Sequence, residues 1–380
     1  RPTQFINNQL FIYESNYIND NFKFTFHAGH FVNHLMEYEK WTAPAFDLTI
    51  RHSRLMPNIR YQFKQFTLNA GSSLGVLDNI NAEGEDKLVP DASTINLGPY
   101  FIIDYEKNNI GFNGGLRYDY KKVSSDDEML DSGFENLFSN TSFSSGAYYK
   151  YMNHIFRITY SGAFRVPDLA ELFSNGVHHG TNRYEIGDQD LNIEYSDQID
   201  FKYQWSNNHL GIVVNPFIQY ISDFITISPL DSFIGGNTVY NYTQLEKVKI
   251  SGLEAHFHYH PHQLHDLHFE QSYSFLKTDI NDSDCGLALT PANSIKTKVL
   301  FDFNSLTSSS IRLDYFSINH THKFKQESFA KYEDLTEGYS VINIQLAIRL
   351  NNSFRAVFSI NNLLNEEYSP HTSRVRGVAG

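Results

Sequence analysis

The stretch ITYSGAFRVPDLAELFSNGVHHGTNRYEIGDQDLNIEYSDQIDFKYQW, residues 158–205, decides the fold. It leaves one alternating strand, breaks at Arg165-Val166-Pro167, runs through a long polar segment and enters a second strand at Tyr195. In the second strand the odd positions 199–205 are apolar or aromatic, and the even positions 196–204 are polar. A strand with this period has one apolar face and one polar face. The stretch therefore predicts a hairpin with a very long connection.

The period of two continues almost from end to end, and helical spacing is nowhere sustained. It is clearest near the C-terminus, where residues 342–348 and 354–360 alternate apolar with polar side chains. The alternation predicts an all-β chain with about sixteen strands, at residues 5–14, 22–30, 45–52, 59–69, 95–106, 109–120, 142–149, 153–161, 195–206, 210–223, 249–260, 266–277, 294–303, 310–318, 338–349 and 354–361.

The predicted connections alternate between short and long. Tight turns are expected at residues 106–109, 151–153, 206–209, 304–309 and 351–352, and long loops at 70–94, 121–141, 162–194, 224–248, 278–293 and 319–337. Short turns on one side and long extracellular loops on the other are typical of outer-membrane barrels. A soluble sandwich or propeller, the alternative all-β fold, has no reason to sort its loops in this way. The pattern therefore predicts a large antiparallel transmembrane β-barrel.

Composition excludes several classes of protein. Aromatic residues make up 15% of the 380 residues, mean hydropathy is −0.40, and no run approaches the roughly 18 apolar residues of a membrane helix. The net charge of −13, with no basic stripe, argues against nucleic acid as a partner. Cys285 is the single cysteine and has no partner for an internal disulfide. Signatures of hydrolases, phosphate-binding loops and zinc proteases are absent, so we expect no enzyme activity.

The wording of several stretches resembles one family. AFRVPDLAELFSNGVHHGTNRYEIGDQDLNIEYSDQIDF (163–201) resembles a loop and strand in the middle of the barrel of TonB-dependent outer-membrane receptors. Four more stretches are similar to successive pieces of the same barrel: LVPDASTINLGPYFIIDYEKNNIGFNGGLRYDY (88–120), KISGLEAHFHYHP (249–261), LTPANSIKTKVLFDF (289–303) and INNLLNEEYSPHTSRVRG (360–377). Within the family, the histidines and FSNGVHHGTNRYEIGD are similar to the zinc-uptake branch.

The resemblance implies an arrangement and a set of partners. Residues 1–380 would be barrel, of the 22-stranded type that a plug domain precedes. Because sixteen strands are predicted, we expect the plug, the first strands and one closing strand to lie outside this sequence. The partners implied are outer-membrane lipid and the TonB-ExbB-ExbD energy-transducing complex, the latter acting through the plug. The location implied is the cell outer membrane of a Gram-negative bacterium.

Histidine is the unusual residue, with 17 in the chain. Imidazole combined with carboxylate suits zinc and similar transition metals, whereas isolated surface histidines are usually only solvated. His178, His179, His320, His322 and His371 fall in predicted extracellular loops, and Glu185, Asp188 and Asp190 share a loop with the first two. We therefore predict metal capture by His178 or His179 with Glu185, and by His320 and His322. The alternative is that His178 belongs to the family wording whatever the cargo.

A second candidate site follows from strand geometry. In the strand 249–260 the even residues Glu254, His256, His258 and His260 share the polar face. A turn at 261–265, with paired residue numbers summing to about 526, would place His258 opposite His268 and His256 opposite Glu270. We therefore predict a metal site near the periplasmic exit, with four ligands: His256, His258, His268 and Glu270. The alternative is a polar wall of the barrel interior that contacts only plug and water.

The predicted function is import of a scarce nutrient by a TonB-dependent receptor. Zinc or another transition metal, free or chelated, is the favoured cargo, and no resident cofactor is required. A ferric-siderophore or haem receptor is the alternative cargo class. A passive porin or an adhesin is the alternative of a different kind.

Overall fold

The computed structural model describes residues 3–38, 44–82, 87–130, 132–178, 181, 183–281, 285–303, 312–327, 329–351 and 353–373. These residues divide into two compact units. Unit 1 comprises residues 1–147, 160–197 and 221–246, and unit 2 comprises residues 148–159, 198–220 and 247–380. Each unit is described by itself below. No helix in the described part of the chain is long and apolar enough to cross a membrane.

Eighteen strands and one short helix make up the described residues. In chain order they are β1 (Thr3–Asn19), β2 (Phe22–Tyr38), β3 (Phe46–Phe63), β4 (Phe66–Asn81), β5 (Ala92–Lys107), β6 (Ile110–Ser125), β7 (Phe134–Tyr151), β8 (His154–Arg165), α1 (Leu169–Phe173), β9 (Asn175–His178), β10 (Arg183–Ile186), β11 (Glu194–Ser206), β12 (Leu210–Ile234), β13 (Asn237–Tyr259), β14 (Leu267–Ile280), β15 (Ser294–Asp302), β16 (Arg312–Lys323), β17 (Tyr339–Arg349) and β18 (Arg355–Ile360).

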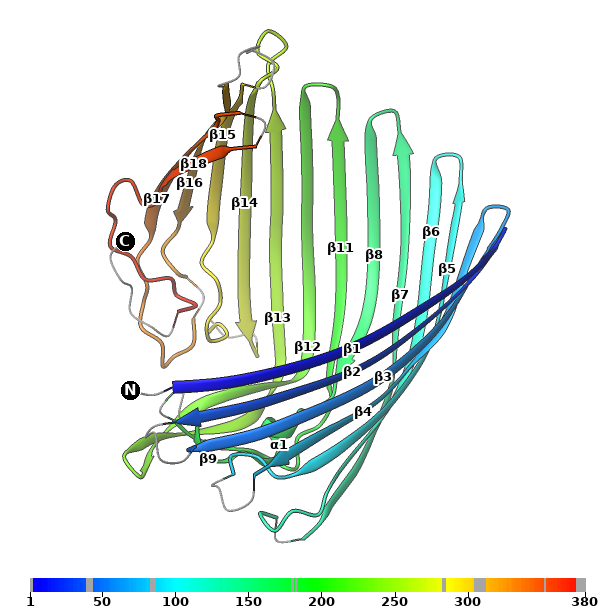
Figure 1. Cartoon of the computed structure of the whole chain (residues 1–380), viewed down its shortest axis with the longest axis vertical. Helices are drawn as coiled ribbons and strands as arrows, with labels where there is room; N and C mark the ends of the chain where they lie inside the picture. The colour runs from blue at the N-terminus through cyan, green and yellow to red at the C-terminus, as the bar shows by residue number, and fades with distance from the viewer. Residues whose placement is uncertain are drawn as a thin grey trace. The chain divides into compact units, whose positions relative to one another are not determined.

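Both units are built from antiparallel hairpins joined in chain order. In unit 1 each of β1 to β6 pairs with its neighbour in sequence, and the first four of these strands lie side by side in blue in Figure 1. In unit 2 the strands β13 to β18 pair in the same way. Antiparallel neighbours can be joined by a two-residue turn, which requires positive φ. Asp20, Lys64 and Asn108 supply it in three such turns, with φ of 40°, 52° and 54°.

Each sheet has an apolar face and a polar face, as predicted. Across β4, β5 and β6, Ala70 lies beside Phe101 and Phe101 beside Leu116, and both large side chains are exposed. On the other face, Arg117 binds the Asp119 carboxylate and donates a hydrogen bond to Ser73 Oγ at 2.9 Å. A continuous exposed apolar band of this kind suits lipid.

The two C-terminal strands show the same separation of faces. Ile344 lies opposite Ile360 and Leu346 opposite Phe358, whereas Gln345 lies opposite Ser359 and donates to its hydroxyl at 3.1 Å. The predicted grouping of apolar with apolar residues is therefore confirmed for these strands.

Three of the predicted strand and loop ranges are wrong. The range 59–69 is wrong, because it spans the turn at Lys64 between β3 and β4. That turn contains no glycine or asparagine, so turn-forming residues do not indicate its position. The predicted loop 224–248 is also wrong, because β12 and β13 continue through it to a turn at Gly235 and Gly236, which have φ of 58° and 84°. The predicted loop 70–94 is wrong over its first half, because most of β4 lies in it. Other predicted loops are shorter than predicted, since the strands extend beyond the length that alternation indicated, and the predicted turn 304–309 lies outside the described residues.

The long connection between β8 and β11 is folded and braced. Asp168 caps α1 by accepting hydrogen bonds from the Ala170 and Glu171 amides at 3.0 Å, and the Glu171 side chain accepts from the Asp168 amide at 2.9 Å. Arg165 binds Glu171 at 2.8 Å and Glu194 at 2.6 Å. Beneath these groups lies a buried cluster within unit 1: Val123, Phe138, Leu172, Phe173, Leu191 and Ile225.

A close backbone approach fixes the end of this connection. A Cβ atom on Gly187 would lie 2.6–2.7 Å from backbone atoms of residues 172–174. Only glycine leaves room for that approach. The segment that carries His178 is therefore positioned from both sides, by α1 before it and by Gly187 after it.

The two-faced sheet predicts an asymmetric response to charge. Arginine in place of Leu116, which is 57% exposed on the apolar face near the middle of β6, should lower the free energy of unfolding in lipid by about 2–4 kcal/mol. Arginine in place of Asn69, on the polar face of β4, is the matched control and should cost much less. Denaturant unfolding of the full-length protein in lipid vesicles measures both. Equal costs at the two positions would contradict the assignment of faces.

Candidate metal-binding clusters

The first candidate site is a hairpin within the braced connection. β9 and β10 pair antiparallel, and β10 also pairs parallel with part of β13. His178 Nδ1 lies 3.0 Å from Glu185 Oε1, and Tyr242 Oη donates a hydrogen bond to Glu185 Oε2 at 3.2 Å. The His178 side chain is 44% exposed, and that of Glu185 is 6% exposed. The structure therefore brings together His178 and Glu185 as predicted, while His179 lies outside the described residues.

The His178–Glu185 hydrogen bond shifts the pKa values of both side chains. The hydrogen bond to Glu185 raises the pKa of His178 above its usual range, although burial opposes the shift. Burial by itself raises the pKa of Glu185, but the hydrogen bond and charge of His178, with help from Tyr242 and Arg183, bring it below its usual range. Glu185 has both oxygens engaged, so it is better placed to orient the imidazole than to bind an ion directly.

The second pair of predicted ligands is not on a loop. His320 and His322 lie on β16, in the part of the strand that pairs with the start of β17, so their assignment to the 319–337 loop is corrected. Both approach the same hydroxyl: Ser340 Oγ lies 3.5 Å from His320 Nε2 and 2.8 Å from His322 Nδ1. Metal binding by these two imidazoles stays a prediction.

His371, also assigned to an extracellular loop, has partners that brace the chain. Its Nδ1 lies 2.8 Å from Thr336 Oγ1 and its Nε2 3.4 Å from Glu333 Oε2, and the side chain is 4% exposed. Glu333 also accepts hydrogen bonds from the Leu289 and Ala330 amides. These contacts give His371 a role in holding loops together.

The third candidate site has a different register from the one predicted. β13 ends at Tyr259 and β14 begins at Leu267, so the turn is longer and paired residue numbers sum to 528 rather than 526. His258 therefore lies opposite Glu270, and His256 opposite Ser272. A shift of two residues keeps every side chain on its predicted face. The prediction that His256, His258, His268 and Glu270 share one face is confirmed. The predicted pairs His258–His268 and His256–Glu270 are wrong.

Three of these four predicted ligands remain close together. The His258 and His268 ring centroids are 5.6 Å apart, and Glu270 Oε1 is 4.0 Å from His258 Nδ1. Lys298 lies 3.5 Å from the other oxygen of Glu270. His256 is separated from this group and lies 3.1 Å from Ser272 Oγ.

His256 instead faces a cavity of about 590 Å³ within unit 2. Residues of six strands, β11 to β16, line it, and the charged and polar ones include Lys202, Asn215, Glu254, His256, Lys296 and Lys323. Three lysines against one carboxylate make this lining cationic. Such a surface suits an anionic ligand better than a bare metal ion.

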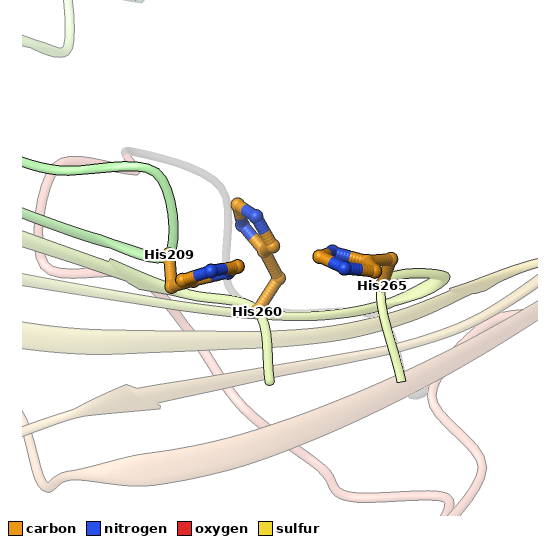
Figure 2. Close-up of side chains that lie close together, drawn as sticks. All are labelled: His209, His260 and His265. Atoms are coloured by element: carbon orange, nitrogen blue, oxygen red, sulfur yellow. The ribbon is translucent and has the colours of Figure 1, made fainter. Parts of the chain in front are cut away.

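The turn next to His258 gathers histidines that the sequence analysis did not combine. We call the following six residues the turn cluster: His209, His258, His260, His262, His265 and His268. Among the described residues, three or more potential metal-binding atoms lie within 4.8 Å of one another at two places, both in this cluster. One group is His209, His260 and His265, shown in Figure 2, and the other is His258, His260 and His268.

The missed residue is His209, in the turn between β11 and β12. The sequence could have indicated His209. The predicted tight turn at 206–209 and the turn at the histidine run are separated by one hairpin, so both lie at the same end of the strands. Burial first, and then the neighbouring histidines, lower the pKa values of His209 and His260. Neutral imidazole is the form that binds metal.

Comparison with known families agrees with this architecture. The sequence model described as "TonB dependent receptor-like, beta-barrel" matches residues 3–363. The chain belongs to this family. Its fold is accordingly all-β, of the large antiparallel transmembrane β-barrel class, and proteins of this family are transporters and receptors of Gram-negative outer membranes.

Solved structures of the family resemble the chain in fold. The copper transporter OprC has a TM-score of 0.79 at 14% identity, covering 97% of this chain and 60% of its own. The FrpB iron transporter from Neisseria meningitidis (F3-3 variant) has a TM-score of 0.75 at 15% identity, with coverage of 99% and 61%. The ferric-catecholate import receptor Fiu from E. coli K12 has a TM-score of 0.67 at 14% identity, with coverage of 97% and 61%. This TonB-dependent receptor chain thus spans about three fifths of the length of these proteins.

The hydrogen bond between His178 and Glu185 in the receptor's hairpin predicts a measurable titration. Replacing Glu185 with glutamine removes the charge that stabilises the His178 imidazolium, so the pKa of His178 should fall toward or below 6.5. In the native protein the raised pKa of His178 adds to the free energy of unfolding. This contribution is fully present below pH 6.5, the pKa of an unperturbed histidine, and is lost as the pH rises through the pKa of His178 in the folded protein. Imidazole NMR shifts of selectively labelled protein in nanodiscs measure both values. An unchanged His178 pKa in the variant would contradict the pairing.

Proposed function

We propose that this chain forms the barrel of a TonB-dependent receptor in the outer membrane of a Gram-negative bacterium, and that its cargo is a transition-metal ion, with zinc favoured. Energy for import would come from the TonB-ExbB-ExbD complex. The observation that carries the cargo proposal is the half-exposed His178 imidazole, held by buried Glu185.

The arrangement around His178 is typical of a metal-binding histidine whose second ring nitrogen is hydrogen-bonded to a carboxylate. Histidines that bind metal usually donate the second ring nitrogen to a carboxylate, which fixes the tautomer and increases the basicity of the ligand. Here Nδ1 is paired with Glu185, and Tyr242 holds the other carboxylate oxygen. Nε2 is then the nitrogen left to meet an ion. A zinc ion would lie about 2.0–2.1 Å from it.

The brace around this segment supports capture at a fixed position. Arg165 ties the start of the connection to α1 and to Glu194, and Gly187 packs against the backbone at the end of α1. A ligand held in this way loses little conformational entropy when the ion arrives. His179 would be the nearest second imidazole in sequence, and the pair would act with carboxylates of the same connection.

A second cargo class has its own supporting observation. The cavity next to His256, with Lys202, Lys296 and Lys323 in its lining, would attract an anionic metal chelate. The copper, iron and ferric-catecholate cargoes of the structural neighbours are named for those proteins only. Uptake measurements separate the two classes.

Growth and uptake in a deletion strain test the proposal. We expect the strain to grow poorly with a zinc chelator, to recover when zinc or the native gene is supplied, and to take up less radioactive zinc. Changing Glu185 to glutamine should reduce uptake roughly 10- to 100-fold, as is typical for a residue that orients a metal ligand. Tyr184→Phe is the matched control, because its hydroxyl bonds Asn175 in the same hairpin and not Glu185.

Two outcomes would contradict the proposed cargo. One is rescue of the deletion strain by ferric chelates or haem but not by zinc. The other is zinc uptake by the His178→Ala variant at the native rate, with the variant present in the membrane at the native level.

A further inference from the structure

We propose that the turn cluster is a second metal site, which binds one divalent transition-metal ion through two alternative sets of three imidazoles that share His260. This site is separate from the His178 hairpin, and the proposal does not rest on the identity of the imported cargo. It lies at the short-turn end of the strands, which in bacterial outer-membrane barrels is the periplasmic end.

The backbone of the two turns is fixed before any ion is considered. The Asn207 side chain accepts hydrogen bonds from the His209 and Leu210 amides, both at 2.8 Å. The His260 amide donates to the His209 carbonyl at 2.9 Å. His209 and His260 are therefore held next to each other by main-chain contacts. In Figure 2 the His209 and His265 rings extend from opposite sides towards the His260 side chain.

The separations between ring nitrogens match those of ligands on one ion. Within the set of His258, His260 and His268, His258 Nε2 lies 3.2 Å from His260 Nδ1. His262 belongs to neither set, and its Nδ1 lies 3.2 Å from His209 Nε2. Two nitrogens bound tetrahedrally at about 2.0–2.1 Å from zinc are roughly 3.3 Å apart. The same distance also fits a single shared proton, and one further observation favours an ion.

That observation is an unsatisfied buried atom. His209 Nδ1 is buried and has no hydrogen-bond partner among the described residues. A buried polar atom without a partner is rare in native structures and calls for an explanation, of which an ion is one. His209 also belongs to one of the two groups of three, in which one ring nitrogen from each histidine lies within 4.8 Å of the other two.

The donor set indicates the class of metal. Both groups consist of three imidazoles, and imidazole suits zinc, copper, nickel and cobalt, whereas magnesium and calcium prefer oxygen ligands. Glu270 lies beside the second group, with Oε1 4.0 Å from His258 Nδ1 and Oε2 3.5 Å from Lys298 Nζ. Three protein ligands leave one tetrahedral position for water or for a donor from a partner.

Metal titration of the full-length receptor in nanodiscs, without an affinity tag of histidines, tests the proposal. Calorimetry with zinc chloride should detect an ion in the native protein that the His260→Asn variant binds at least tenfold more weakly, because both sets lose a ligand. His209→Asn and His268→Asn should each retain binding through the other set, and the double variant should lose it. His30→Asn, on β2 outside the cluster, is the control and should bind as the native protein does.

Zinc-edge X-ray absorption provides a readout that does not depend on the variants. Recorded at one equivalent of zinc on protein that carries His178→Asn, which removes the ligand of the proposed cargo site, it should show nitrogen or oxygen ligands at about 2.0–2.1 Å with outer-shell scattering from about three imidazoles. Adding His30→Asn should leave that spectrum unchanged. Native affinity and stoichiometry in the His260→Asn variant would overturn the proposal. A spectrum of oxygen ligands with no imidazole scattering would overturn it as well.

Discussion

Backbone hydrogen bonding between neighbouring antiparallel strands is the constraint on which the rest of this structure depends. A peptide group that faces hydrocarbon has no water to bind, so each strand in a membrane must be paired along its length. Pairing with period two separates side chains into an apolar and a polar face. The candidate sites are consequences of that separation, because Glu254, His256 and His258 share one face and successive turns meet at one end of the strands.

Much of the fold could be predicted because alternation is a local property of the sequence. Each of the sixteen predicted ranges overlaps a strand, but alternation did not reveal β9 and β10, which have only four residues each. It also placed most of β4 in the predicted loop 70–94. The turn at Lys64 was not predicted, because lysine is not a residue that indicates a positive φ. The length of the β12–β13 hairpin escaped because pairing continues wherever backbone groups find partners, whatever the polarity of the side chains.

The sites were less predictable because they depend on register and on contacts between distant segments. The turn after β13 was judged two residues too short, which changed the partner of His258 from His268 to Glu270 without changing its face. His209 was missed because it is 51 positions before His260, and only the adjacency of two turns brings them together. The pairing of His178 with Glu185 was anticipated from residue types, but the part played by Tyr242 could only come from the structure.

The central claim, that one face of each strand meets lipid and the other meets water, can be measured on β13. Spin labels placed singly at residues 253–258 of the full-length protein in vesicles report collisions with oxygen, which concentrates in lipid, and with a water-soluble nickel complex. The structure predicts oxygen access at Leu253, Ala255 and Phe257, and nickel access at Glu254 and His258. Access that does not alternate, or that alternates in the opposite sense, would contradict the account.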